Sequence, residues 1–428
     1  MALGSRSRLA LVVLAVAVVL AAPSAYATNG YFSHGYSLYE SGMGGAGVAY
    51  PQDCLAAATN PAGMVLVGNC TVFGVTFFRP QRSTVISGSG AGANGTYDGN
   101  GNSSFIIPQF GYNRMLNDRM SLGIAVYGNG GMNTSYTTAI PLFGTSPAGV
   151  DLSQLIIAPT FAWKINASNS VGISLNFAYQ MFSAYGLQNF DNPFVSTSAG
   201  HVTNKGQDTA TGWGLRIGWI GQISPTVTLG ATYQTVTTMS RFGNYQGLFA
   251  NQGEFDIPAS YAAGVAVEMN PKTTIAADVE RIQYSGVPAV ANPMSNLFGC
   301  PAFGGTNPSH CLGGSNGPGF GWQDITVWKV GIAYQLTPAL TVRAGYDHGD
   351  NPISSSNVLF NVLAPGVVTD HVSVGATWTV ATDRELTVAY MHAFTNSITG
   401  PIPAAFGGGT ANISLSEDSL GAAYRWRF

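Results

Sequence analysis

Residues 323–349, QDITVWKVGIAYQLTPALTVRAGYDHG, decide the fold, because two alternating segments lie on either side of a short polar turn. Large apolar side chains share one face of the first segment, at Trp328, Val330, Ile332, Tyr334 and Leu336. The opposite face carries Lys329, Gly331 and Ala333. A tilted strand of about ten residues is long enough to cross an outer membrane. The stretch therefore predicts a transmembrane β-hairpin whose apolar face meets lipid.

Turns of this kind recur along the chain, and longer Gly-, Ser- and Asn-rich loops alternate with them. The turns are Leu116–Asp118, Asn166–Asn169, Ser224–Thr226, Asn270–Lys272, Thr337–Ala339 and Ala381–Asp383. The stretches between them are long enough for two membrane-crossing strands each. Short turns at one end and long loops at the other are typical of a transmembrane β-barrel.

The alternation begins at Cys70 and continues to the last residue, which gives an expected set of strands. They are 70–87, 104–115, 119–130, 153–166, 169–185, 208–223, 227–239, 254–269, 273–284, 323–336, 340–349, 367–380, 384–396 and 414–428. The count is fourteen, and closed bacterial barrels have an even number of strands. The last strand ends in an aromatic residue, Phe428, after Tyr424 and Trp426 on the same face. This ending is typical of a barrel in the bacterial outer membrane, with aromatic residues at the interface.

The N-terminus predicts export. Arg6 and Arg8 precede an apolar run of 14 residues, 9–22, and an A-x-A site follows at Ala25–Ala27. Cleavage of a signal peptide, residues 1–27, leaves 401 residues (428 minus 27) with no second long apolar run. Only 9% of the residues are charged, whereas soluble domains have about a quarter. A barrel explains this composition, because its apolar residues face lipid at alternate positions.

The four cysteines form two pairs that are close in sequence, Cys54 with Cys70 and Cys300 with Cys311. Disulfides persist in an exported protein, and neither pair has C-x-x-C spacing, so two disulfides are favoured over a metal site. The net charge of -3 and the absence of Lys/Arg runs give no indication of nucleic-acid binding. No cofactor is expected.

Charged residues on the inward face have two interpretations. By parity they are Arg216, Glu268, Asp278, Glu280, Lys329, Arg343, Asp347 and Arg425. Such residues normally pair, which favours a ladder of ion pairs that fills the lumen. The alternative is that cations such as Arg216, Lys329 or Arg343 bind the carboxylate of a ligand.

Irregular residues surround the third strand. Pro108 and Pro159 fall inside the strands before and after it, and the strand ends in Gly128-Asn129-Gly130-Gly131. Proline removes a donor from the ladder and glycine permits a kink or bulge. The residues indicate either a functional opening in the wall or an ordinary bulge at the barrel rim.

An enzyme is the least favoured class. Asp347-His348 and Asp370-His371 are adjacent acid and histidine pairs, and no G-x-S-x-G motif accompanies them. An outer-membrane lipid hydrolase stays an alternative, as does a porin for polar solutes. A porin predicts a wider lumen, many inward charges and no plug.

Two motifs near the N-terminus resemble those of a known family. Ser41-Gly42-Met43-Gly44 followed by Asn60-Pro61-Ala62-Gly63-Met64 is similar to the start of the FadL family of outer-membrane transporters for hydrophobic compounds. The resemblance implies a monomeric, fourteen-stranded antiparallel barrel, residues 70–428. It also implies an N-terminal hatch in the lumen, residues 28–69, with Asn60, Pro61 and Ala62 as its signature.

The resemblance also implies a mechanism. Extracellular loops capture a hydrophobic molecule, an apolar pocket in the lumen receives it, and the hatch then moves. The molecule leaves sideways into outer-membrane lipid at a kink in the third strand, here Gly128–Gly131. Long-chain fatty acids are the expected ligands, with aromatic hydrocarbons as the other class. Two features depart from the family: the Cys54–Cys70 pair would tie the hatch to the first strand, and a disulfide would pin the long loop 285–322.

Overall fold

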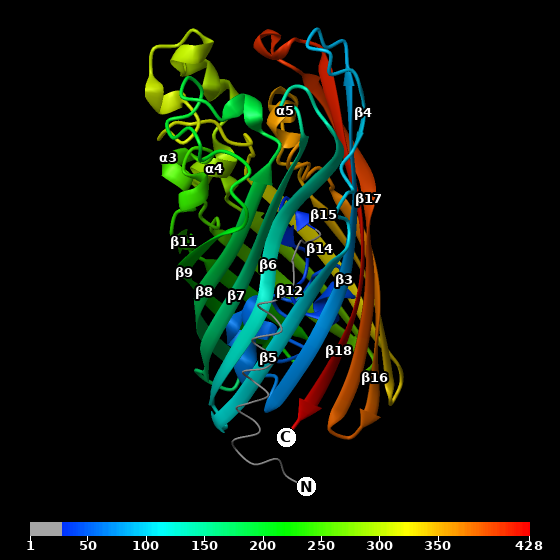
Figure 1. The fold of residues 1–428 in the computed structure, drawn as a ribbon. Helices are drawn as coiled ribbons and strands as arrows, with labels where there is room; N and C mark the ends of the chain where they lie inside the picture. The colour runs from blue at the N-terminus through cyan, green and yellow to red at the C-terminus, as the bar shows by residue number, and fades with distance from the viewer. Residues whose placement is uncertain (1–27) are drawn as a thin grey trace.

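A computed structural model describes residues 28–428, so the expected signal peptide lies outside the described residues. Eighteen strands join in one sheet of antiparallel ladders, and four of them are pieces of two to four residues. The remaining fourteen form a wall that closes where the last strand pairs with the first (Figure 1). The predicted closed barrel of fourteen strands is therefore confirmed.

The wall strands are β3 (Cys70–Ser87), β5 (Phe105–Asn117), β6 (Met120–Ala139), β7 (Pro147–Lys164), β8 (Asn169–Tyr185), β9 (Asp208–Ser224), β10 (Val227–Gln234), β12 (Ser260–Asn270), β13 (Thr273–Ile282), β14 (Ile325–Thr337), β15 (Leu340–Gly349), β16 (Asp370–Ala381), β17 (Arg384–Pro401) and β18 (Thr410–Arg427). The short strands are β1 (Thr28–Asn29), β2 (Phe32–Ser33), β4 (Gly95–Asp98) and β11 (Thr238–Met239). All six predicted turns join neighbouring strands at one end of the barrel, which we call the turn end. The C-terminus lies at this end, and the long loops lie at the other, the loop end (Figure 1).

Some predicted strand bounds were wrong. The third strand, β6, runs to Ala139 instead of residue 130, and β7 begins at Pro147 instead of residue 153. Residues 133–138 are mostly polar and lack apolar alternation, which a strand needs only where it faces lipid. Conversely, β12 begins at Ser260 instead of residue 254, because residues 254–259 belong to a loop. The N-terminal segment, which lies before the predicted alternation, contains only the two-residue strands β1 and β2.

The two faces of the wall follow the predicted parity. Trp213 on β9 and Trp328 on β14 are each 60% exposed, on the outer side, while Arg216 and Lys329 are buried. On β18 the outer face is apolar from Trp426 up to Leu420 and polar from Asp418 to Thr410. The change indicates where the wall leaves the lipid. No helix within residues 28–428 is long and apolar enough to span a membrane.

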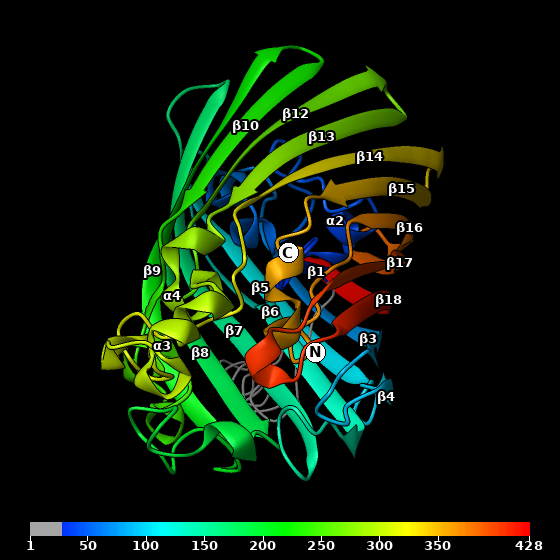
Figure 2. The same cartoon turned by 90° about the horizontal axis from the view of Figure 1, so that it is seen from above.

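The N-terminal segment, residues 28–69, fills the inside of the ring of strands (Figure 2). It contains α2 (Leu38–Ser41) and two 3-10 helices, η1 (Ala56–Ala58) and η2 (Pro61–Val65). The wall has glycine where the segment approaches most closely. A Cβ at Gly331 or Gly345 would overlap Met43, so these glycines make room for the segment.

The loop end carries a cap of short helices (Figure 1). They are η3 (Gln188–Phe190), η4 (Gly243–Tyr245), α3 (Ala250–Gly253), η5 (Tyr284–Gly286), α4 (Pro288–Ala291), η6 (Met294–Gly299), η7 (Pro301–Phe303), η8 (Pro308–His310), η9 (Ser355–Asn357), α5 (Val358–Asn361) and η10 (Ala404–Phe406). Both predicted disulfides are present. Cys300–Cys311 closes part of the loop 283–324, and Cys54–Cys70 joins the N-terminal segment to the start of β3.

Candidate functional site

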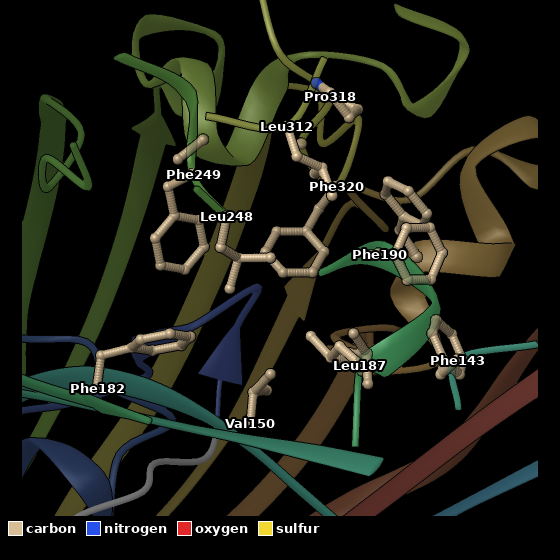
Figure 3. A pocket seen from close by; sticks show the side chains of 14 residues that line it. Phe143, Val150, Phe182, Leu187, Phe190, Leu248, Phe249, Leu312, Pro318 and Phe320 are labelled. Atoms are coloured by element: carbon tan, nitrogen blue, oxygen red, sulfur yellow. The ribbon is translucent and has the colours of Figure 1, made fainter. Parts of the chain in front are cut away.

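An apolar pocket lies under the cap at the loop end (Figure 3). Its lining residues come from five loops and two strands: Phe143, Val150, Phe182, Leu187, Phe190, Leu248, Phe249, Ala289, Leu312, Pro318, Gly319, Phe320, Phe360 and Leu363. The pocket has a volume of about 540 Å³, counting the part that opens outward. None of these side chains carries a charge. Pockets for small ligands have predominantly apolar walls, so this lining suits a hydrophobic molecule.

Aromatic side chains connect the pocket to the N-terminal segment. Phe249 packs on Phe255 with ring centroids 4.9 Å apart, and Phe320 lies 6.4 Å from Trp322. Phe255 and Trp322 both contact the Tyr31 ring, at 6.2 and 5.8 Å. A ligand that moves either pocket phenylalanine therefore acts on a ring that contacts Tyr31.

The Tyr284 hydroxyl bonds to the backbone of Tyr31 and of Asn29. The Tyr31 amide donates to the Tyr284 hydroxyl at 3.0 Å, and that hydroxyl donates to the Asn29 carbonyl at 2.6 Å. Asn29 also donates from Nδ2 to Asp347 Oδ2 on β15 at 3.2 Å. The first described residues are thus fixed to the wall by directional polar bonds.

The wall has a gap between β5 and β6. Their ladder runs from the turn end only as far as the pair Phe110–Val126, and no β5–β6 pair beyond it occurs in the described chain. Met115 donates its amide away from β6, to Asn69. Successive backbone nitrogens of a strand face opposite sides, so the nitrogens of residues 110 and 108 face β6. Residue 108 is a proline, so the donor is missing where the ladder ends.

A bulge marks the β6 side of the gap. The β6–β7 register shifts between Gly128 and Gly130, which leaves Asn129 as an extra residue. Asn129 is fully buried, donates from Nδ2 to Gln154 Oε1 at 2.9 Å and accepts from the Tyr36 hydroxyl at 3.2 Å. The bulge residue is thus bound to the neighbouring strand and to the N-terminal segment.

The N-terminal segment covers this bulge from inside. Phe32 of β2 pairs with Gly130, and the Gly131 amide donates to the Tyr31 carbonyl at 3.1 Å. A Cβ at position 130 would overlap that carbonyl, so only glycine permits the approach. A second cavity of about 460 Å³ lies between the segment and the wall, and its lining includes Ile107, Gln109, Tyr127 and Gly128 from the two edges of the gap.

The structure brings four of the five predicted gate residues together. Pro108, Gly128, Gly130 and Gly131 all lie at the gap. Pro159 does not: it pairs with Ile124 of β6 in an unbroken part of that ladder and interrupts the ladder between β7 and β8 instead.

The three cations predicted to bind a ligand are buried, and each contacts protein groups. Arg216 donates to the Thr59 carbonyl at 3.0 Å and to Gln234 at 2.5 Å. Lys329 Nζ lies 2.9 Å from Glu280 Oε2. Arg343 donates to Gln52 at 3.0 Å and to Thr377 at 2.7 Å. Arg216 and Arg343 thus bind the N-terminal segment, whereas Lys329 forms an ion pair within the wall.

Arg216 and Lys329 also border one cavity of about 340 Å³, together with Asp278 and Glu280. Asp278 accepts the amides of Gly47 and Val48 at 2.7 and 3.0 Å. This cavity lies against the N-terminal segment and shares no lining residue with the apolar pocket.

The predicted signature Asn60-Pro61-Ala62 anchors the segment. Asn60 Nδ2 donates to the carbonyls of Val48 at 2.8 Å and Trp219 at 3.0 Å, and its Oδ1 accepts the Ala62 amide at 3.1 Å. The last bond caps η2, and Pro61 occupies the first helical position, which suits proline. A Cβ at Gly172 of β8 would overlap Pro61 and Ala62, so η2 lies directly against the wall.

Carboxyl groups stabilise the fold of the N-terminal segment internally. Glu40 Oε2 accepts from the Thr59 hydroxyl at 2.8 Å, and Ser37 donates to Asp53 Oδ2 at 2.8 Å. Burial, and then the nearby Asp53 carboxyl, raises the pKa of Glu40 to about 8. Glu40 is therefore mainly uncharged at neutral pH.

The expected acid and histidine pairs form across strands instead of between sequence neighbours. His371 Nδ1 lies 2.8 Å from Asp347 Oδ1, and His348 Nδ1 lies 2.9 Å from Asp370 Oδ1. The His371 ring stacks on His34 of the N-terminal segment, with centroids 6.0 Å apart. Within residues 28–428 no group of three or more His, Cys, Asp or Glu side chains is placed to hold a metal ion.

Sequence reasoning missed the lining of the apolar pocket. Those residues belong mainly to loops, where no period identifies an inward face. The available signal was composition, since loops that are otherwise rich in Gly, Ser and Asn contain Phe143, Phe190, Phe249, Phe320 and Phe360.

Comparison with known proteins gives one family and a group of related folds. The family model described as outer membrane protein transport protein (OMPP1/FadL/TodX) matches residues 18–402. Among solved structures, the Pseudomonas putida toluene transporter TodX has 18% identity and a TM-score of 0.67, covering 92% of this chain and 99% of its own. A Pseudomonas aeruginosa FadL homologue has 14% identity and a TM-score of 0.70, covering 93% and 100%.

The Ralstonia pickettii toluene transporter TbuX has 17% identity and a TM-score of 0.63, covering 92% of this chain and 99% of its own. No curated protein sequence matches the chain. At these identities the structural matches establish the fold.

Proposed function

Because the chain belongs to the outer membrane transport protein family OMPP1/FadL/TodX, we propose that it takes up hydrophobic molecules passively through the outer membrane. The wall is that of a bacterial outer-membrane barrel, whose long loops face the outside. A molecule binds the apolar pocket under the loops, passes the N-terminal segment, and leaves sideways between β5 and β6. In this role the segment is a hatch.

The pairing of Phe32 with Gly130 carries the proposal. Through it a hatch residue pairs with β6 at the gap in the β5–β6 ladder, and the preceding residue, Tyr31, contacts two rings that adjoin the pocket lining. Release of β2 would uncover the gap to the lumen. An apolar molecule gains by leaving through such a gap, because its surface passes into hydrocarbon instead of water.

The disulfide divides the hatch into two parts. Residues 54–69 are held by Cys54–Cys70 and by Asn60, so we assign them to a fixed foot. Residues 28–53 carry no disulfide to the wall; they attach through hydrogen bonds, through contacts of the Tyr39 ring with Arg343 and Arg425, and through apolar packing, and we assign them to the moving head. Polar bonds of this kind are individually worth only about 0.5–1.5 kcal/mol, which allows exchange between docked and released states.

The pocket favours an uncharged ligand, and a small aromatic hydrocarbon is the first candidate. The structural relatives TodX and TbuX are toluene transporters, and the pocket lining contains no cation to bind a carboxylate. A long-chain fatty acid, which the family resemblance implied, is the second candidate. The buried cations Arg216 and Lys329 beside the lumen cavity support it.

A substitution of Val150 tests the pocket. Val150 is buried in the lining, so Val150→Asp places a carboxylate in an apolar cavity, while Val150→Thr keeps the size and replaces one methyl group with a hydroxyl. We expect Val150→Asp to weaken toluene binding by roughly tenfold or more, and Val150→Thr to weaken it less. Uptake of radiolabelled toluene and oleic acid into proteoliposomes is the measurement.

Each result has a consequence. Loss of toluene uptake with retained oleic acid uptake would place the fatty acid at another site. Uptake of neither molecule by the wild type, combined with steady ion conductance in planar bilayers, would contradict the proposal and support a porin.

A further inference from the structure

The gap between β5 and β6 has a limit toward the loop end, because loop residues bond to β6 again there. The Ser135 amide of β6 donates to the Gly99 carbonyl at 3.0 Å, and the Gly101 amide donates to the Ser135 carbonyl at 2.8 Å. Asn100, between the two glycines, forms a parallel bridge with Ser135. We call residues 99–101 the loop-end border. β6 is therefore held at both ends of the gap, by β5 at one end and by the border at the other.

The loop-end border continues the line of β5 along the wall. β3 pairs with β5 and then, farther toward the loop end, with β4, which directly precedes the border in sequence. The Gly99 amide donates to the Arg82 carbonyl of β3 at 3.1 Å, and the Arg82 amide donates to Asn100 Oδ1 at 2.8 Å. The border thus bonds to β3 on one side and to β6 on the other.

The Arg82 side chain joins the two sides of the gap. It is 2% exposed and extends from β3 to β6, where Nη1 donates to the carbonyl and to Oδ1 of Asn133, both at 2.7 Å. Nη2 donates at 2.6 Å to the carbonyl of Asn102, which directly follows the border. All three acceptors are uncharged oxygens. A planar guanidinium has five donors in a fixed arrangement, so one arginine can bind both segments at once.

Arg82 also lines a cavity on the lumen side of the gap. This cavity has a volume of about 370 Å³, counting the part that opens outward, and its lining includes Gly131 and Met132 of β6 and Gly30 of the hatch. Phe78 lines both this cavity and the cavity of about 460 Å³ between the hatch and the wall. The arginine therefore lies beside the space through which we expect a ligand to leave.

We propose that Arg82 limits how far β5 and β6 can part, and so sets the width of molecule that the side exit admits. This proposal rests on the proposed uptake function and specifies its substrate class: single aromatic rings pass, and flat molecules of three fused rings are disfavoured. A seam that is held at both ends opens only between them, whereas a seam that is held at one end can splay. Arg82 acts through the border, so it is a positioning residue and needs no contact with the ligand.

Arg82→Met tests this limit in the full-length protein, because it keeps an apolar stem and removes all three side-chain hydrogen bonds. Arg79→Met is the matched control, since Arg79 lies on the same strand and is exposed on the outer face. The measurement is uptake of radiolabelled phenanthrene relative to toluene in proteoliposomes. We expect this ratio to rise roughly threefold to tenfold in Arg82→Met, the factor for a constraint worth about one hydrogen bond, and to stay unchanged in Arg79→Met.

A disulfide at the border should replace the arginine. A Cβ at Gly101 would lie 3.4 Å from the Ser135 Cβ, close to the separation of about 3.5–4.5 Å in disulfides. In Arg82→Met with Gly101→Cys and Ser135→Cys, we expect oxidation to return the ratio to the wild-type value and reduction to raise it again. The single cysteine variants control for reduction of the native disulfides. An arginine that only stabilised a loop would not make the ratio follow oxidation.

Arg82→Lys keeps the buried charge and loses the planar fork, so it supplies the same comparison if Arg82→Met does not fold. An unchanged ratio in a folded Arg82 variant, or a ratio that does not respond to oxidation, would overturn the proposal. With toluene uptake intact, that result would remove only the role of Arg82 and keep the transport function. Uptake of neither molecule by the wild type would contradict the transport function itself.

Discussion

Two seams of the wall differ in how far their strands pair. The closing seam between β18 and β3 has an unbroken run of eighteen residue pairs, from Arg427–Cys70 to Thr410–Ser87. The seam between β5 and β6 has seven pairs, from Asn117–Met120 to Phe110–Val126, although β6 is 20 residues long. The seams are neighbours, because β3 pairs with both β18 and β5.

The comparison shows what keeps each seam closed. In the β18–β3 seam the backbone groups of the two strands bond to each other. At the β5–β6 seam, backbone groups near Gly131 bond to the N-terminal segment instead. Unsatisfied backbone groups cost several kcal/mol in lipid. The second seam therefore depends on a part of the chain that is not in the wall.

Hydrogen exchange should show the largest difference. We expect amides near the gap, at Ile106 and Gly131, to exchange on the order of a thousandfold faster than amides in the middle of the β18–β3 seam, because local opening there breaks few bonds. Exchange mass spectrometry of the protein in bilayers compares peptides 104–110 and 127–133 with peptides 77–83 and 414–420. Equal protection at both seams would contradict the comparison.

A methyl group at the bulge should release the hatch. In Gly130→Ala the Cβ overlaps the Tyr31 carbonyl, so this carbonyl loses the hydrogen bond from the Gly131 amide, and Phe32 loses part of its burial. We expect a cost of about 2–3 kcal/mol, which shifts the docked population roughly 30- to 150-fold and raises small-solute leak. Single-channel conductance measures the leak.

The matched control for this substitution lies on the other seam. At Gly421→Ala the nearest atoms are side-chain atoms of Leu38 and Thr76, which can shift. Leu38 belongs to the hatch head, so this control also touches the head, without a clash against its backbone. Leak in Gly421→Ala equal to that in Gly130→Ala would show that hatch docking does not depend on the bulge.

A backbone donor restored at position 108 should narrow the gap between β5 and β6. Its expected effect is smaller than those on hydrogen exchange and on leak. Pro108→Ala supplies an amide directed at β6, worth about 0.5–1.5 kcal/mol, so we expect toluene uptake to fall roughly twofold to tenfold. Pro159→Ala is the control, because it supplies an amide at the β7–β8 ladder. If both variants slow uptake equally, the position of Pro108 has no special role.

Much of the wall could be predicted from the sequence, because one physical rule applies to every strand that meets lipid. Alternation in residues 323–349 gave the correct faces for Trp328 and Lys329, and the same rule identified fourteen strands. Apolar alternation is required only where a strand faces lipid. For that reason the polar upper part of β6 and the start of β7 were missed.

The site was less predictable, because it depends on partners that are distant in sequence. Pro108 and Pro159 both fall inside predicted strands, so the sequence does not distinguish them. They differ in the neighbouring strand that lacks a backbone donor, which is β6 for Pro108 and β8 for Pro159. Parity correctly placed Arg216 and Arg343 inside, yet it could not show that both bind the N-terminal segment. The pocket phenylalanines lie in loops without a period, so only folding brings them together.

A reversible tether of the hatch head tests the account most directly. A Cβ at Gly349 would lie 2.7 Å from Asn29 Oδ1 and 3.6 Å from Asn29 Cγ, so Asn29→Cys with Gly349→Cys places two sulfurs within bonding reach. The single variants control for the lost Asn29–Asp347 bond and for reduction of the native disulfides. We predict that the oxidised double variant binds toluene and does not transport it, and that reduction restores uptake. Uptake at the wild-type rate in fully cross-linked protein would contradict the claim that the hatch head must leave the wall.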